Sequence, residues 1–137
     1  MEGVCEIQYK THDRNLPVDM FIKLAEQVWP STYDEKYTAE ALKRTINTTA
    51  WCGGELIGCV RVLSDGYFFG TVSEILVLPN YQKRGIGRRL MKLAFDTSPT
   101  SLFFGARPEV AGFYEKLGYE KSMQCFSKKK PRRQADA

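Results

Sequence analysis

Two glycines and a cluster of cationic side chains give one loop of this sequence the means to bind an anion. The segment is Gln82-Lys83-Arg84-Gly85-Ile86-Gly87, and it directly follows the apolar run 75–78. This order predicts a strand, a glycine loop and a helix that begins near Ile86. The N–H groups at such a helix N-terminus attract anions, and glycine lets a phosphate approach without a Cβ in the way. The loop therefore predicts a phosphate site, with an ordinary strand-to-helix turn as the alternative.

The charges around the loop strengthen this interpretation. Cationic side chains at a helix N-terminus are unfavourable by about 0.3–1 kcal/mol each unless an anion binds there. Four of them surround this helix start: Lys83, Arg84, Arg88 and Arg89. A dinucleotide-binding fingerprint fits poorly, because its third glycine would fall on Leu90.

Few other residues could carry nucleophilic or metal chemistry. The only histidine, His12, lies in a polar stretch, so neither a Ser-His-Asp triad nor a histidine-based zinc site is expected, and no metal is predicted. The four cysteines show no C-x-x-C spacing, and we expect them to be reduced and buried, as in a cytosolic protein. They are Cys5, Cys52, Cys59 and Cys125.

The composition is that of one globular domain. The chain has 137 residues, of which 43% are apolar, and this is enough to form a proper core. Its net charge is +4. The sequence shows no apolar run of the ~18 residues that a membrane span needs, and its first residues lack the features of a signal peptide. We therefore predict a cytoplasmic location without membrane contact.

The elements that would position the loop follow from the hydrophobic pattern. Pro17 opens the first helix and Thr38 caps the second. The order predicts an α+β fold with one mixed, mostly antiparallel sheet and about four helices. The predicted strands are 4–9, 50–52, 55–63, 67–77, 101–104 and 122–127, and the predicted helices are 15–29, 38–47, 86–96 and 109–117.

The C-terminus is a basic run without apolar partners, Lys128-Lys129-Lys130-Pro131-Arg132-Arg133. We predict a folded domain over residues 1–127 and a solvated, disordered tail over residues 128–137. A contact of this tail with a nucleic acid or another acidic partner is the alternative.

Two motifs and the order of elements resemble the GCN5-related N-acetyltransferase (GNAT) superfamily. The loop 82–87 matches the family's Q/R-x-x-G-x-G/A pyrophosphate loop. Segment 111–119, Ala-Gly-Phe-Tyr-Glu-Lys-Leu-Gly-Tyr, resembles the family's A-x-x-F-Y-x-x-x-G-F/Y segment. The resemblance covers about residues 4–127. One position departs from the pattern, because the family often has a cofactor-contacting Asn where this chain has Pro108.

The resemblance implies acetyl-CoA as the donor and a primary amine as the acceptor. Backbone N–H groups of residues 83–88 would hold the pyrophosphate, and Gln82 would brace the loop. The backbone of the strand before the loop would pair with the pantetheine arm as with an added strand. The implied cofactor-binding residues are Leu76, Val77, Gln82, Lys83, Arg84, Gly85, Ile86, Gly87, Arg88 and Phe113.

The resemblance also implies two catalytic residues. Tyr114 would be the general acid, since a phenol with a pKa of about 10 is neutral at pH 7 and can protonate a departing thiolate. Its alternative role is aromatic packing. Glu74 lies on the strand before the loop, on the same face as Leu76, and would take a proton from the amine directly or through a water. Its alternative role is a structural salt bridge.

The region between the first helix and the central hairpin should form the acceptor site. Aromatic rings there suit an amine with an apolar body, or a cation held against a ring face, while core packing is their alternative role. Nearby carboxylates at 34, 35 and 40 would attract a cationic amine. The candidate rings are Trp29, Tyr33, Tyr37, Phe68 and Phe69.

We therefore expect an acetyltransferase that acts on a small amine by direct attack, without a covalent enzyme intermediate. One alternative is a CoA-binding regulatory module without turnover. Another is an acetyltransferase for a protein or aminoacyl-tRNA amine. A nucleic-acid-associated protein, whose loop and tail would touch phosphate, is less favoured. A homodimer through an exposed strand edge is left open.

Overall fold

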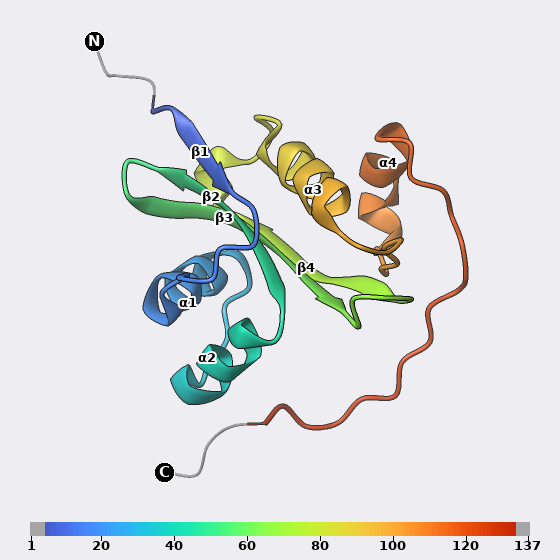
Figure 1. Ribbon diagram of the computed structural model, residues 1–137, viewed down its shortest axis with the longest axis horizontal. Coiled ribbons are helices and arrows are strands. Elements are labelled where there is room, and N and C mark those ends of the chain that lie inside the picture. Colours follow the sequence, from blue (N-terminus) through green and yellow to red (C-terminus); the bar gives the residue numbers. More distant parts are fainter. Residues whose placement is uncertain (1–4, 134–137) are drawn as a thin grey trace.

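The computed structural model describes residues 5–133 and shows one antiparallel sheet with helices on both faces (Figure 1). The strand order is β1-β2-β3-β4, with α1 and α2 against one face and α3 and α4 on the other side. The predicted α+β class is confirmed. The elements are β1 Ile7–Lys10, α1 Val18–Val28, α2 Glu35–Lys43, β2 Ile46–Cys52, β3 Glu55–Ser64, β4 Gly70–Val77, a 3-10 turn Pro79–Tyr81, α3 Ile86–Thr97 and α4 Pro108–Lys116.

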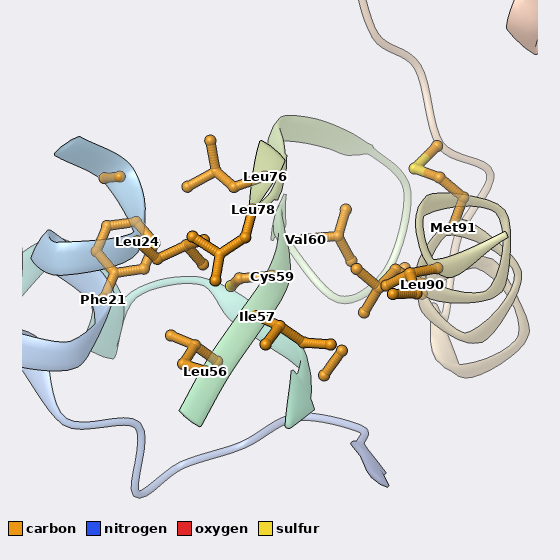
Figure 2. Packing of buried hydrophobic residues seen from close by; sticks show 14 of the residues in the cluster. Phe21, Leu24, Leu56, Ile57, Cys59, Val60, Leu76, Leu78, Leu90 and Met91 are labelled. Atoms are coloured by element: carbon orange, nitrogen blue, oxygen red, sulfur yellow. The ribbon is translucent and has the colours of Figure 1, made fainter. Parts of the chain in front are cut away.

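The core lies on both faces of β3, the strand between β2 and β4. Apolar side chains of α1, including Phe21 and Leu24, cover one face, and those of α3, including Leu90 and Met91, cover the other. Figure 2 shows these two groups on opposite sides of the strand. All four side chains are at most 2% exposed, and burying each one stabilises the fold by about 1.5–3 kcal/mol. This packing holds α3 against the sheet and so fixes where its N-terminus lies.

A bulge interrupts the pairing of β3 with β4. Arg61 pairs with Glu74, but the next residue, Val62, pairs with Val72, so Ser73 is the additional residue on β4. Bulges bend a strand and redirect its side chains, and they are frequent beside active sites. Here the bulge lies directly before Glu74, the candidate base.

The second helix begins earlier than its predicted cap. We expected Thr38 to cap it, but Asp34 is the N-cap and its carboxylate accepts a hydrogen bond from the Tyr37 N–H at 2.8 Å. Aspartate and threonine are both good caps, so the sequence offered two starts. The first strand is also shifted, to Ile7–Lys10, and the predicted position at residue 4 lies outside the described residues.

Two of the six predicted strands are wrong. Segment 101–104 forms a single parallel bridge between Phe103 and Thr71 at the start of β4, and segment 122–127 is exposed and lies in no strand. A strand needs a neighbour that offers unpaired backbone groups, and a short alternating pattern does not show whether one is within reach.

The expectation that all cysteines are reduced and buried is also wrong. Cys5 and Cys52 form a disulfide, with their Cα atoms 5.7 Å apart. Ile7 pairs with Cys52, the last residue of β2, so Cys5, two residues before Ile7, lies near this end of β2. The sequence spacing of 47 residues gave no sign of this pairing. Cys59 is buried as expected, but Cys125 is exposed.

A methyl group at Gly58 should disturb the packing that holds α3. Its Cβ would lie 3.0 Å from Leu90 Cδ1 and 3.2 Å from the Leu76 carbonyl oxygen. We expect Gly58→Ala to lower the free energy of unfolding by about 1–3 kcal/mol, measured by urea denaturation. Gly112→Ala on α4 is the matched control, since its Cβ would meet no described atom within 4 Å and alanine favours the helix. Equal stability of the two variants would contradict this account of the core.

Candidate active site

The loop between β4 and α3 contains two residues with an unusual backbone conformation. Lys83 and Gly85 both have left-handed backbone conformations, with φ of 64° and 83°. Left-handed residues next to right-handed ones turn successive N–H groups toward one concave side, where an anion can bind. The Gln82 side chain donates from Nε2 to the Val77 carbonyl oxygen at 2.9 Å, across the 3-10 turn. Gln82 thus makes a hydrogen bond that can brace the loop, as the resemblance implies, and phosphate binding by the loop stays a prediction.

The N-terminus of α3 carries positive charge with no compensating acid. Within the described chain, no side chain caps this helix, and its first turn contains no acidic residue. Lys83, Arg84 and Arg88 are exposed around it. The Arg84 guanidinium lies 5.2 Å from the Tyr81 ring centroid, which holds this charge beside the turn. Free N–H groups and cations at one point can bind the two negative charges of a pyrophosphate.

Gly87 brings together three of the elements that form the candidate cofactor site. A Cβ on Gly87 would lie 3.7 Å from Ile75 Cδ1, 3.9 Å from Val77 Cγ2 and 3.9 Å from Phe113 Cζ. The start of α3 is therefore in contact range of both β4 and α4. The buried Ile86 side chain anchors the same turn in the core. The structure thus places Val77, Gln82, Gly87 and Phe113 around one point.

The outer edge of β4 offers backbone groups to a strand-like ligand. The sheet order ends at β4, and the bridge to Phe103 lies at the opposite end of the strand from the loop. Leu78 donates its N–H to the Ile57 carbonyl, so by alternation the backbone groups of Ile75 and Val77 point away from β3. The backbone of Leu76 faces β3, and its predicted contact with the cofactor stays a prediction.

Tyr114 lies half-buried on α4 in an aromatic cluster. Its ring centroid is 4.8 Å from that of Phe104, 5.0 Å from that of Phe113 and 6.0 Å from that of Tyr119. Burial raises the pKa of Tyr114 above its ordinary value, and the neighbouring Tyr119 raises this pKa further. The phenol is therefore protonated at neutral pH, as a proton donor must be.

Glu74 is held by an arginine that sequence reasoning missed. Arg61 Nη1 donates to Glu74 Oε1 at 2.7 Å, and Arg61 Nε donates to Thr45 Oγ1 at 3.3 Å. The guanidinium carbon also lies 5.6 Å from the Phe21 ring centroid. The predicted hairpin could not have found this pair, because its turn at 64–66 would place residue 61 opposite residue 69. In the structure the loop is longer and a bulge follows, so Arg61 lies opposite Glu74. The ion pair fixes one carboxylate oxygen.

A cleft of about 190 Å³ lies on the side of the sheet that α1 and α2 cover. It contains Glu74 together with aromatic rings and a second carboxylate from the segment between α1 and α2. Two of the predicted acceptor residues lie here, Tyr33 and Tyr37. The lining residues are Phe21, Tyr33, Asp34, Tyr37, Thr38, Ala41, Arg61, Glu74, Arg132 and Arg133.

The other predicted acceptor residues lie apart from this cleft. Trp29 stands at the end of α1, where the Arg107 guanidinium is 5.1 Å from its ring centroid. Phe68 is 89% exposed in the loop between β3 and β4, and Phe69 stacks on Phe103 with centroids 5.8 Å apart. Their contact with an acceptor stays a prediction.

Covalent catalysis by the buried cysteine does not fit the site. Cys59 is fully buried, and this burial raises the pKa of its thiol, with Glu74 adding to the rise. A buried, protonated thiol is unreactive. Residues 5–133 contain no group of three or more histidine, cysteine or acidic side chains that could hold a metal. The described helices include none long and apolar enough to cross a membrane.

The acetyltransferase (GNAT) domain family matches residues 45–121, which is more than half of the chain and includes the loop, β4 and α4. The chain therefore belongs to the GNAT acetyltransferase family, and the predicted resemblance is confirmed. The matches to curated relatives span 27–41% of the length of those proteins.

Individual relatives agree with this assignment. The chain is 39% identical over 72 residues to GCN5-related N-acetyltransferase 2, chloroplastic, of Arabidopsis thaliana, a match that covers 48% of this chain but 27% of that protein. The fold of this chain is similar to that of a GNAT family acetyltransferase from Streptococcus pneumoniae TIGR4, with a TM-score of 0.71 at 24% identity. The match covers 90% of this chain and 100% of the other. The fold is also similar to that of aminoglycoside N-acetyltransferase AAC(6′)-Iy in complex with CoA, with a TM-score of 0.71 at 14% identity, over 96% and 99% of the two chains.

A negative charge at position 87 should compete with the cofactor. In Gly87→Glu the new carboxylate would lie at the α3 N-terminus, where it can take the N–H groups and cations that would hold a phosphate. We expect acetyl-CoA to bind at least about tenfold more weakly, a loss of about 1.4 kcal/mol, measured by calorimetric titration.

The same substitution should not unfold the protein. A Cβ at position 87 meets its neighbours at ordinary contact distances, and an acid in the first turn of a helix is favourable. Gly87→Ala is the control for bulk alone. If Gly87→Glu is folded and binds acetyl-CoA with native affinity, the phosphate-loop assignment is wrong.

Proposed function

We propose that this protein transfers the acetyl group of acetyl-CoA to a primary amine of a small molecule, by direct attack and with Tyr114 as the general acid. The observation that carries the proposal is the convergence of three features along β4: an uncapped, cationic helix N-terminus, a strand edge with outward backbone groups, and a cleft that contains Glu74.

The cofactor would bind from the loop along the strand edge. Backbone N–H groups of residues 83–88 would hold the pyrophosphate, with Arg84 and Arg88 adding charge-assisted contacts. The pantetheine amides would pair with the Val77 N–H and with the outward backbone groups of Ile75, while the Val77 carbonyl accepts from Gln82. Phe113 would then pack beside the arm, where Gly87 leaves room. This path leads the thioester along β4 toward Glu74.

The reaction needs one bond to form and one to break. The neutral amine nitrogen attacks the thioester carbonyl carbon, and the carbon–sulfur bond then breaks as the amide forms. The thiolate takes a proton from the Tyr114 hydroxyl, and the attacking nitrogen loses its proton to Glu74, directly or through a water. Because Arg61 holds Glu74 Oε1, the other carboxylate oxygen, Oε2, would take this proton. The Tyr114 phenolate regains a proton from solvent while Glu74 releases the one it took, so that one proton passes net from the amine to the thiol.

The cleft favours a small acceptor over a large one. Its volume of about 190 Å³ admits a small amine body, and its rings and carboxylates suit a cationic one. The similar aminoglycoside N-acetyltransferase is named for a small-molecule acceptor, which supports the same class here. An acceptor amine on a protein or an aminoacyl-tRNA is the alternative.

Removal of one hydroxyl group tests the general acid. Tyr114→Phe keeps the ring that packs on Phe104 and Phe113 but has no proton to donate. We expect kcat to fall by about 10²–10⁴-fold while acetyl-CoA affinity stays unchanged, measured by thiol release and calorimetric titration. Tyr119→Phe is the matched control, since its ring packs in the same cluster. A kcat of Tyr114→Phe equal to that of the control would show that Tyr114 only packs.

The pH dependence of the rate tests the base. Glu74→Gln keeps the shape of the side chain but cannot accept a proton. If Glu74 is the base, the variant should turn over about 10²-fold more slowly at pH 7. Its rate should then rise with pH, because solution deprotonates a growing fraction of the amine. If the variant keeps the native rate and the native pH profile, Glu74 is not the base. Water would then be the base, and Glu74 would serve only in the ion pair with Arg61.

A further inference from the structure

The chain after α4 returns to the opposite side of the molecule. It leaves α4, passes along the outside and reaches the neighbourhood of α2 near the C-terminus (Figure 1). Sequence reasoning treated residues 128–137 as a solvated tail. Its last described residues, Arg132 and Arg133, instead line the cleft that contains Glu74.

Both arginines lie against aromatic rings of this cleft. The Arg132 guanidinium carbon is 4.5 Å from the Tyr33 ring centroid, and Nη1 donates to Ser31 Oγ at 2.9 Å. The Arg133 guanidinium carbon is 4.9 Å from the Tyr37 ring centroid. A cation within about 6 Å of a ring face is attracted by the negative face of the ring. Two successive residues therefore make the same kind of contact with two rings of one cleft.

The charges of the cleft explain why cations bind there. Without the tail, the lining contains two carboxylates, Asp34 and Glu74, and one guanidinium, Arg61, so its formal charge is −1. Arg132 and Arg133 add two positive charges, which brings it to +1. A cationic acceptor would thus meet a negative cleft when the tail is away and a positive one when the tail is in place.

We propose that this cleft is a subsite for a cationic group of the acceptor, and that Arg132 and Arg133 occupy it as an internal competitor until the acceptor displaces them. The acceptor role of the cleft rests on the function proposed above, whereas its occupation by the tail does not. The acceptor class is then an amine that carries a second positive charge, since a cation regains the attraction to the ring faces that is lost when the guanidinium groups leave.

Tethering makes a weak contact sufficient for this competition. The effective concentration of a segment joined to its site by a flexible linker is on the order of 1 mM. Consider a free copy of the segment that binds the empty cleft with a Kd of about 0.1 mM. Competition from the tethered tail would raise its apparent Kd for the native chain about tenfold, relative to a chain whose tail cannot compete.

The test compares three full-length chains in calorimetric titrations with one peptide. The probe is the capped tetrapeptide Lys-Pro-Arg-Arg, which copies residues 130–133. The chains are the native protein, the double variant R132A/R133A, and the control K128A/K129A, which loses the same charge from exposed positions of the same tail. We expect the peptide to bind R132A/R133A about tenfold more tightly than the native chain, and K128A/K129A to behave as native.

Equal affinity for the native chain and R132A/R133A, or no binding to either, would overturn the proposal. A gain of the same size in K128A/K129A would overturn it too, because net charge alone would then account for the effect.

A kinetic measurement distinguishes a failure of this proposal from a failure of the proposed function. With spermidine as the probe acceptor, KM should fall about tenfold in R132A/R133A while kcat stays at the native value. The peptide titration contains no acetyl-CoA and needs no turnover. If the peptide distinguishes the chains but no amine is acetylated, occupation of the cleft by the tail stands and the proposed function fails.

Discussion

The N-terminus of α3 is the constraint on which the rest of the structure depends. A helix start leaves N–H groups without intrahelical partners, and within the described chain no side chain caps this one. The sequence adds cations at the same point, where the positive end of the helix dipole repels them. This arrangement makes physical sense when an anion completes it. The core packing of Leu90 and Met91 then serves to hold this unsatisfied point rigidly at the end of β4.

The alternation of β4 connects the donor and acceptor sides. Ile75 and Val77 face the start of α3, and Glu74 faces the cleft beneath α1 and α2. Successive residues of a strand point to opposite faces, so one strand can carry both sites within a few residues. At the bulge the additional residue Ser73 shifts this alternation by one residue, directly before Glu74. A small displacement of β4 would therefore affect both sides together.

Much of this architecture could be predicted from sequence, where the signal is local. The apolar spacing of α3, the two glycines of the β2–β3 turn and the proline at the start of α4 each identify their element. The candidate phosphate loop and Tyr114 could be proposed because the family resemblance rests on short motifs. In these cases the residues that specify the structure lie within one element.

The rest depends on contacts between distant residues. The Cys5–Cys52 disulfide, the ion pair of Arg61 with Glu74, and Arg132 against Tyr33 each join residues far apart in the sequence. No local pattern encodes such pairs, and the second depends on a loop length and a bulge that the predicted hairpin lacked. The missing strands at 101–104 and 122–127 have the same cause, since pairing depends on which edge the folded chain leaves open.

The central claim is that the α3 N-terminus binds the pyrophosphate of acetyl-CoA. Calorimetric titration of the native protein with acetyl-CoA and with S-acetylpantetheine, which lacks the pyrophosphate and the nucleotide, tests it most directly. The account predicts one site per chain with micromolar affinity for acetyl-CoA, and binding of S-acetylpantetheine weaker by about 100-fold or more, about 2.7 kcal/mol. No binding of acetyl-CoA at millimolar concentration, or equal affinity for the two ligands, would contradict it.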